Sequence, residues 1–184
     1  MYAQTPNDKD STYLIKNSKH ATYLELGYSG ATIFHPGISG SLYKPVAFKK
    51  NENRNALSEL FLGVQAGIYY HHNMHTGLYA GGTAKWVKTS LKGFQYGFDL
   101  QLGYLRTFIP QVYEITSAGE IKHLPFAGTN HFELFPSFRL GHHLQNDSFI
   151  SGWYIKNGLM VTMPYTGNVA SQYFFEAGIV KRLN

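Results

Sequence analysis

Apolar and polar side chains alternate in about eight segments of roughly ten residues each along this chain. The alternation is clearest in residues 59–70. One face of that segment has the apolar side chains of Leu60, Leu62, Val64, Ala66, Ile68 and Tyr70. The other face has Glu59, Phe61, Gly63, Gln65, Gly67 and Tyr69. Since successive side chains of a strand point to opposite sides, the pattern predicts strands with one apolar face and one mixed face.

The mixed face contains charged residues in segment after segment, and little else in the chain is available to cover the apolar faces. A soluble β-sandwich buries its apolar faces between two sheets. A transmembrane β-barrel instead turns them toward lipid and fills its interior with polar side chains. The sequence therefore predicts an all-β fold, an eight-stranded antiparallel transmembrane β-barrel with a short polar N-terminal arm.

Composition agrees with this fold. Aromatic residues make up 16% of the 184 residues and charged residues only 15%, compared with about 25% charged residues in ordinary soluble domains. No apolar run approaches the roughly 18 residues of a spanning helix, but a barrel strand needs only about 9–11. The chain has no cysteine, which excludes disulfides and thiolate metal sites. The net charge of +5 is scattered, so we expect no nucleic-acid partner.

We expect an arm at residues 1–20 and one barrel domain at 21–184. The alternation places strands at 21–30, 38–49, 59–70, 76–88, 94–107, 131–143, 149–163 and 171–183. Pro45 interrupts the second strand and leaves its register open, and we expect bulges at Pro45 and Pro136. The longest connection, 108–130, contains a possible short hairpin around 117–119, and an extracellular ligand for it stays an open question.

Charged residues on the mixed faces are expected to point into the barrel, where an eight-stranded barrel has room only for side chains. Unpaired buried charge is costly, so these residues should pair and close the interior instead of lining a pore. A proton or ion path is the alternative. The predicted interior network consists of Glu25, Glu59, Lys85, Asp99, Glu133, Arg139, Lys156, Glu176 and Arg182.

Aromatic residues near the ends of the apolar faces suit the girdles at the two membrane interfaces. A ligand-stacking platform is the alternative. The expected interfacial aromatics are Tyr28, Tyr70, Trp86, Phe94, Tyr104, Trp153 and Tyr173, with Phe48 and Phe108 in the same belts.

Histidines could bind zinc or nickel, but His71, His72 and His75 share one short loop, and His142 and His143 are adjacent on a strand. Adjacent strand residues point to opposite faces, so we expect no metal site and no cofactor.

Nucleophiles for an outer-membrane lipid A-modifying enzyme are also scarce. The chain contains no His-x-Ser, and Asp147-Ser148, a dipeptide of palmitoyl-transferring barrels, falls on a predicted periplasmic turn. Ser137 shares a face with Glu133 and Arg139 but has no histidine base in register. We expect no catalytic residues, and a lipid A acyl hydrolase or transferase remains the alternative function.

The last strand carries a further pattern, in which Glu176, Gly178 and Leu183 match a barrel-assembly signal, although Lys181 and Asn184 stand where aromatic residues are usual. With the strand count, this resembles the small eight-stranded outer-membrane barrels of the OmpA and OmpX kind, in their Bacteroidota variety, over residues 20–184. The resemblance implies the bacterial outer membrane, reached after removal of a signal peptide.

We therefore expect a non-enzymatic integral outer-membrane protein that serves as an accessory or scaffold subunit of a larger assembly. Its expected partners are outer-membrane lipid, lipopolysaccharide and other outer-membrane or periplasmic proteins. A soluble lipocalin-type carrier is a further alternative. That fold turns its apolar face inward and usually has a Gly-x-Trp near its first strand, which is missing here.

Overall fold

The computed structural model describes residues 21–31, 35–51, 56–72, 74–117, 119–124, 126–144, 149–165 and 168–183. The expected arm at 1–20 and the dipeptide Asp147-Ser148 lie outside the described residues. In the described ranges no helix is long and apolar enough to cross a membrane.

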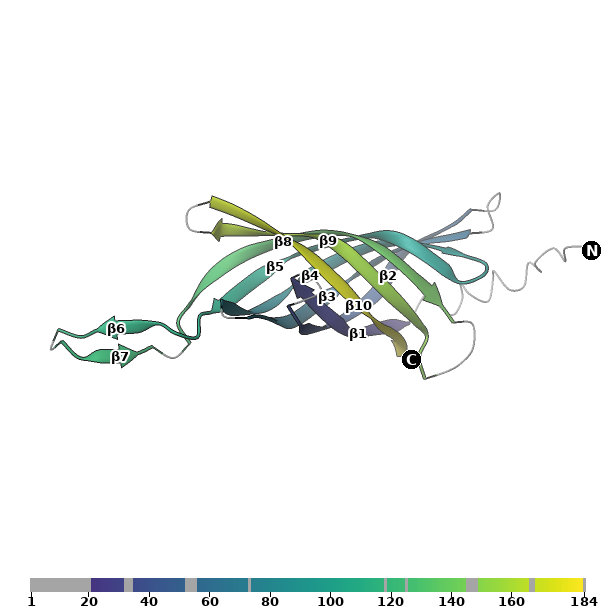
Figure 1. Ribbon diagram of the computed structural model, residues 1–184. Helices are drawn as coiled ribbons and strands as arrows, with labels where there is room; N and C mark the ends of the chain where they lie inside the picture. Colours follow the sequence, from purple (N-terminus) through teal and green to yellow (C-terminus); the bar gives the residue numbers. More distant parts are fainter. Residues whose placement is uncertain are drawn as a thin grey trace, which may run out of the picture.

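Eight long antiparallel strands close into a barrel with the order β1-β10-β9-β8-β5-β4-β3-β2 (Figure 1). The predicted all-β antiparallel barrel is therefore confirmed. The barrel strands are β1 (Thr22–Ala31), β2 (Gly37–Asn51), β3 (Ala56–His71), β4 (His75–Ser90), β5 (Phe94–Phe108), β8 (Gly128–His143), β9 (Gly152–Tyr165) and β10 (Asn168–Leu183). The first and last strands close the ring through a register that runs from Thr22 opposite Leu183 to Ala31 opposite Phe174.

A second, two-stranded sheet lies within the long connection between β5 and β8. It consists of β6 (Tyr113–Ile115) and β7 (Ile121–His123), which pair antiparallel and form the hairpin predicted around residue 117. Gly119 adopts a positive φ of 82° in the turn, where its N–H donates to the Thr116 carbonyl (2.8 Å). This hairpin projects beyond the barrel wall at the end opposite the C-terminus (Figure 1). We call that end the hairpin end, and the end where β1 begins and β10 ends the terminal end.

Pro45 produces the predicted bulge in β2. The register with β3 shifts between Pro45 opposite Phe61 and Ala47 opposite Leu60. The extra residue reverses the alternation, so Phe48 lies opposite Glu59 on the inner side of the sheet. The expectation that Phe48 belongs to an outer aromatic belt is therefore wrong, because a bulge moves every later side chain of the strand to the other face.

Pro136 does not produce the predicted bulge. Leu100 lies opposite Pro136 in an unshifted register with β5. On the other side, the register with β9 runs from Leu134 opposite Val161 to Ser137 opposite Gly158, which is three residues on each strand. Proline cannot donate to the ladder, and here β8 accommodates it without an inserted residue.

Two tyrosines and two glycines pack reciprocally between β3 and β4. Tyr79 lies opposite Gly67, and Tyr69 lies opposite Gly77. A Cβ at Gly67 would come within 2.4 Å of the Tyr79 hydroxyl, and one at Gly77 within 2.4 Å of the Tyr69 ring. Each ring therefore occupies the space that a side chain on the neighbouring strand would need, and glycine is required at both places.

Candidate functional site

The inner face of the barrel contains an unbroken chain of six ionised side chains drawn from six strands. Lys85 on β4 and Arg139 on β8 both pair with Glu25 on β1. Arg139 Nη1 also lies 3.2 Å from Asp99 Oδ2 on β5. Lys156 Nζ on β9 lies 3.8 Å from the same oxygen and 2.5 Å from Glu176 Oε2 on β10. Three acids thus alternate with three bases, and the six side chains together have a formal charge of zero.

Neutral side chains complete the hydrogen bonding of the first carboxylate. Ser41 Oγ donates to Glu25 (2.9 Å) and Tyr43 Oη donates to it as well (2.8 Å). Lys85 Nζ lies 3.8 Å from the centroid of the Tyr43 ring. Both β2 residues were missed by the sequence prediction, because the register of this strand was open. The alternation of Ser39, Ser41 and Tyr43 with Ile38 and Leu42, N-terminal to Pro45, was the available signal.

The carboxylate at the other end of the chain has its own set of donors. Glu176 accepts hydrogen bonds from Ser39 Oγ (2.6 Å), Gln65 Nε2 (3.0 Å) and Tyr154 Oη (2.9 Å). Gln65 is used twice, since its Oε1 accepts from Lys156 Nζ (3.2 Å). Buried charge is tolerated when it is paired and its remaining hydrogen-bonding capacity is used. Both conditions hold for Glu176, whereas Asp99 Oδ1 and Arg139 Nε have no hydrogen-bond partner.

Apolar clusters lie on both sides of the charged layer. The cluster toward the terminal end consists of Tyr43, Phe61, Val87, Tyr154 and Val180, with Tyr23 packed against it. The cluster toward the hairpin end consists of Tyr69, Tyr79, Leu105, Phe135, Met160 and Phe174. All of these side chains except Tyr23 are buried. The interior is thus layered along the barrel axis as apolar, charged and apolar.

Three further residues of the predicted interior network lie outside this ion-pair chain. Glu133 is buried and accepts a hydrogen bond from Gln101 Nε2 (2.9 Å), while its Oε2 has no hydrogen-bond partner. Glu59 is buried nearer the terminal end, opposite Phe48 and Val87. Arg182 is half-buried opposite Tyr23, and its backbone N–H donates to Ser151 Oγ (2.9 Å).

The outer face is a continuous apolar wall. Its most exposed strand residues include Phe132 (73% exposed), Ile38 (66%) and Val64 (60%). Among the described residues, no aspartate or glutamate of a barrel strand is exposed, since Glu25, Glu59, Asp99, Glu133 and Glu176 are all buried. The acids of the described barrel strands are therefore confined to the inner face, whereas Lys44 and Lys49 are exposed on β2.

The predicted interfacial aromatics lie on this outer wall. Tyr70, Trp86, Phe94, Tyr104, Trp153 and Tyr173 are exposed, and Tyr28 is half-buried. Trp86 stacks on Phe98 (centroids 6.3 Å apart), and Phe98 meets Phe138 edge-on (5.5 Å). These contacts join β4, β5 and β8 through one aromatic patch.

Histidine rings gather at the hairpin end. His35 stacks on His71 (centroids 3.7 Å apart), and His71 stacks on His75 (5.4 Å). His72 is exposed in the turn, and His142 and His143 are half-buried at the terminal end of β8. Within the described ranges, no group of three or more histidine, cysteine or acidic residues is arranged to hold a metal ion.

Ser137, the one serine weighed as a nucleophile within the described residues, is buried, and its Oγ donates to the carbonyl oxygen of Asp99 (3.4 Å). No family model, curated protein or solved structure matches this chain.

Proposed function

We propose that this chain is an integral outer-membrane β-barrel protein without enzymatic activity, acting as an accessory or scaffold subunit of a larger assembly. The observation that carries the proposal is the combination of an apolar outer wall with an interior in which three buried acids pair with three buried bases. An exposed strand residue such as Val64 or Leu102 loses about 1.5–3 kcal/mol of transfer free energy when it faces water instead of an apolar medium. Repeated around the whole barrel, that cost favours a lipid environment.

The layered interior supports a structural role in preference to a channel. Eight-stranded barrels have room for side chains but none for an aqueous pore. In this protein the network of six ion-paired side chains spans the lumen, and an apolar cluster lies on each side of the network. A permeating ion would have to break these contacts, so the proposal assigns no transport activity.

The projecting hairpin supports the subunit role. Ile115 (75% exposed) and Ile121 (74%) lie opposite each other on β6 and β7, which project beyond the barrel wall (Figure 1), and Phe126 (78%) lies in the connection between β7 and β8. Exposed apolar side chains clustered on a rim commonly mark a protein interaction site. The proposal therefore assigns contact with a partner protein to this hairpin.

The test is purification of a tagged chain from native outer membranes in mild detergent, followed by mass spectrometry of the proteins that co-elute. A stoichiometric partner is expected, and the double variant Ile115→Ser/Ile121→Ser should release it. The matched control is Val169→Ser, which changes an exposed apolar residue of a barrel strand (61% exposed). A chain that elutes alone at every detergent concentration would contradict the subunit role.

A further inference from the structure

The basic residues of the outer surface are distributed unevenly along the barrel. In the described ranges the exposed acids are Glu114 and Glu120, both on the hairpin. Three barrel strands instead present a lysine at the same distance from their terminal end. Lys49, Lys88 and Lys181 each stand two residues before the last residue of β2, β4 and β10, which end at Asn51, Ser90 and Leu183. Lys49 is exposed, and Lys88 and Lys181 are half-buried. Lys92 is exposed in the turn after β4, and Lys44 is exposed further along β2.

Lys88 is the lysine of this set that adjoins the aromatic patch. Its Nζ lies 5.8 Å from the centroid of the Tyr96 ring, on the neighbouring strand. Trp86, two residues earlier on the same outer face, packs against the edge of Tyr96 (centroids 6.5 Å apart) and stacks on Phe98. Amphipathic rings beside cations are typical of the depth at which lipid headgroups meet acyl chains.

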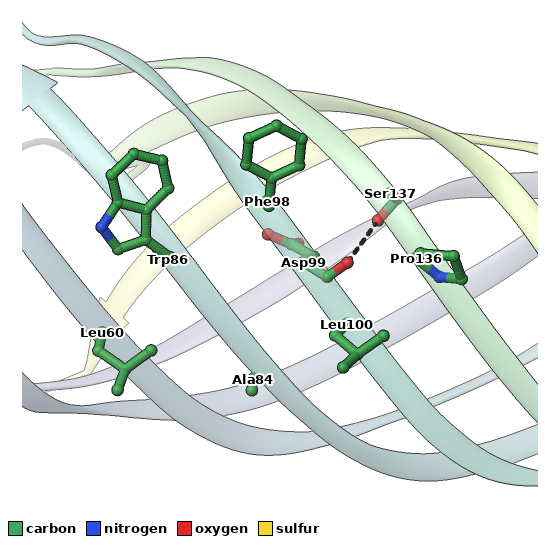
Figure 2. A pocket seen from close by; sticks show the side chains of 8 residues that line it. All are labelled: Leu60, Ala84, Trp86, Phe98, Asp99, Leu100, Pro136 and Ser137. Carbon is green, nitrogen blue, oxygen red and sulfur yellow. Dashed lines mark hydrogen bonds between the residues drawn. The ribbon is translucent and has the colours of Figure 1, made fainter.

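A hollow of about 290 Å³ opens on the outer wall next to this patch. It is lined by Leu60, Ala84, Trp86, Phe98, Leu100 and Pro136, with Asp99 and Ser137 behind them (Figure 2). Ala84 and Pro136 leave space because they are smaller than their aromatic neighbours. Asp99 and Ser137 point their side chains into the barrel, where both are buried. The surface of the hollow that faces outward is therefore apolar.

The cation and the hollow lie in line on one strand. Lys88, Trp86 and Ala84 follow each other on the outer face of β4, two residues apart. At about 3.4 Å per residue, roughly 14 Å separates Lys88 from Ala84. A phospholipid whose phosphate lies at Lys88 would place its first acyl carbons beside Trp86 and later ones in the hollow.

We propose that the outer wall formed by β3, β4, β5 and β8 binds one anionic phospholipid, with its phosphate at Lys88 and an acyl chain in the hollow over Ala84. This inference rests on the proposed membrane location of the barrel. None of the described acids at the terminal end is exposed. The lysines there therefore select a negatively charged headgroup over a zwitterionic one. The apolar hollow selects an acyl chain over a polar ligand.

The experiment places the full chain in nanodiscs that contain equal amounts of phosphatidylglycerol and phosphatidylcholine, and counts the lipids retained on the protein by native mass spectrometry. Retention of phosphatidylglycerol over phosphatidylcholine is expected. Lys88→Gln should lower that preference about fivefold. Ala84→Leu, which fills the hollow, should lower the retention of both lipids about threefold, because the two lipids have the same acyl chains.

Two controls use the same substitutions elsewhere on the chain. Lys122→Gln removes an exposed lysine from the hairpin, and Ala80→Leu adds the same side chain to the outer face of β4 away from the hollow. Lys122→Gln should leave the preference unchanged, and Ala80→Leu should leave the retention of both lipids unchanged. Equal retention of the two lipids would overturn the inference, and so would equal effects of Lys88→Gln and Lys122→Gln. Extraction from native membranes with lipopolysaccharide retained in place of phospholipid would overturn it as well. Failure of the chain to enter nanodiscs of phosphatidylcholine alone would instead overturn the proposed membrane location.

Discussion

Arg139 and Glu25 stand 114 residues apart in the sequence and form an ion pair at the centre of the barrel. Because Arg139 also reaches Asp99, this one guanidinium joins β1 to β5 and β8 across the lumen. The centroid of the Tyr154 ring lies 4.4 Å from the guanidinium carbon of Arg139. Barrel closure and the interior network are thus coupled through a single side chain.

Replacing Arg139 with alanine should lower the free energy of unfolding by about 3–5 kcal/mol, because Glu25 and Asp99 then lose a buried counter-charge. Urea unfolding of the barrel in phospholipid vesicles, followed by tryptophan fluorescence, measures this. Lys122→Ala on the exposed hairpin is the control and should change stability by less than about 0.5 kcal/mol. Equal stability of the two variants would refute a central role for Arg139.

Glu133 and Glu176 should respond in opposite directions to the same substitution. Glu176→Gln removes the partner of Lys156 and should cost about 3 kcal/mol or more. Glu133 has no ion pair among the described residues, and Gln101 Oε1 beside it has no hydrogen-bond donor. Glu133→Gln replaces a carboxyl group that has no ion pair and supplies an N–H donor, so stability should stay the same or rise by about 1 kcal/mol. A loss of stability as large as that of Glu176→Gln would show that Glu133 is paired.

Gly77→Ala should destabilise the barrel by about 1–3 kcal/mol, since its Cβ would overlap the Tyr69 ring. Gly82 on the same strand has no atom within 4 Å of the position of an added Cβ, so Gly82→Ala is a matched control. It should be neutral or slightly stabilising. Both variants can be compared by the midpoint of urea unfolding, and a similar loss for both would count against the reciprocal packing.

The cost of a cation on the outer wall should depend on its depth. Leu102→Arg, near the middle of β5, should lower the free energy of unfolding in vesicles by about 2–4 kcal/mol. At Phe94, at the end of the strand, the charge introduced by Phe94→Arg should lower it by only about 0–1 kcal/mol. The depth profile is measured by unfolding a series of arginine variants along the outer face of β5. A flat profile would indicate that this face meets water.

The alternation of side chains was sufficient to predict the barrel, because it reports directly which face of each strand is apolar. In β3 and β8 every inner residue named from the sequence other than glycine, such as Gln65 and Glu133, is buried. Alternation failed where one inserted residue reversed it, at the Pro45 bulge. Phe48, after the bulge, lies on the face opposite to the predicted one. The two Glu25 donors Ser41 and Tyr43, before the bulge, were missed because the register of the strand was left open.

The pairing of the interior charges could not be predicted from the sequence. Which acid meets which base depends on the stagger of the strands around the barrel, which no local pattern reports. Glu25 and Glu133 are equivalent in sequence terms, since both are inward acids among apolar neighbours. The structure gives Glu25 two cationic partners and leaves Glu133 with an amide.

The central claim is that the outer wall faces lipid, and the absence of native cysteine allows a direct test with single-cysteine variants. Val64→Cys, Leu102→Cys and Leu159→Cys on the wall, and Lys122→Cys on the hairpin, are treated with a membrane-impermeant maleimide in sealed native membranes and again after denaturation. If the wall faces lipid, Lys122→Cys is labelled in both states and the three wall variants are labelled only after denaturation. Rapid labelling of the wall positions before denaturation would contradict a transmembrane barrel.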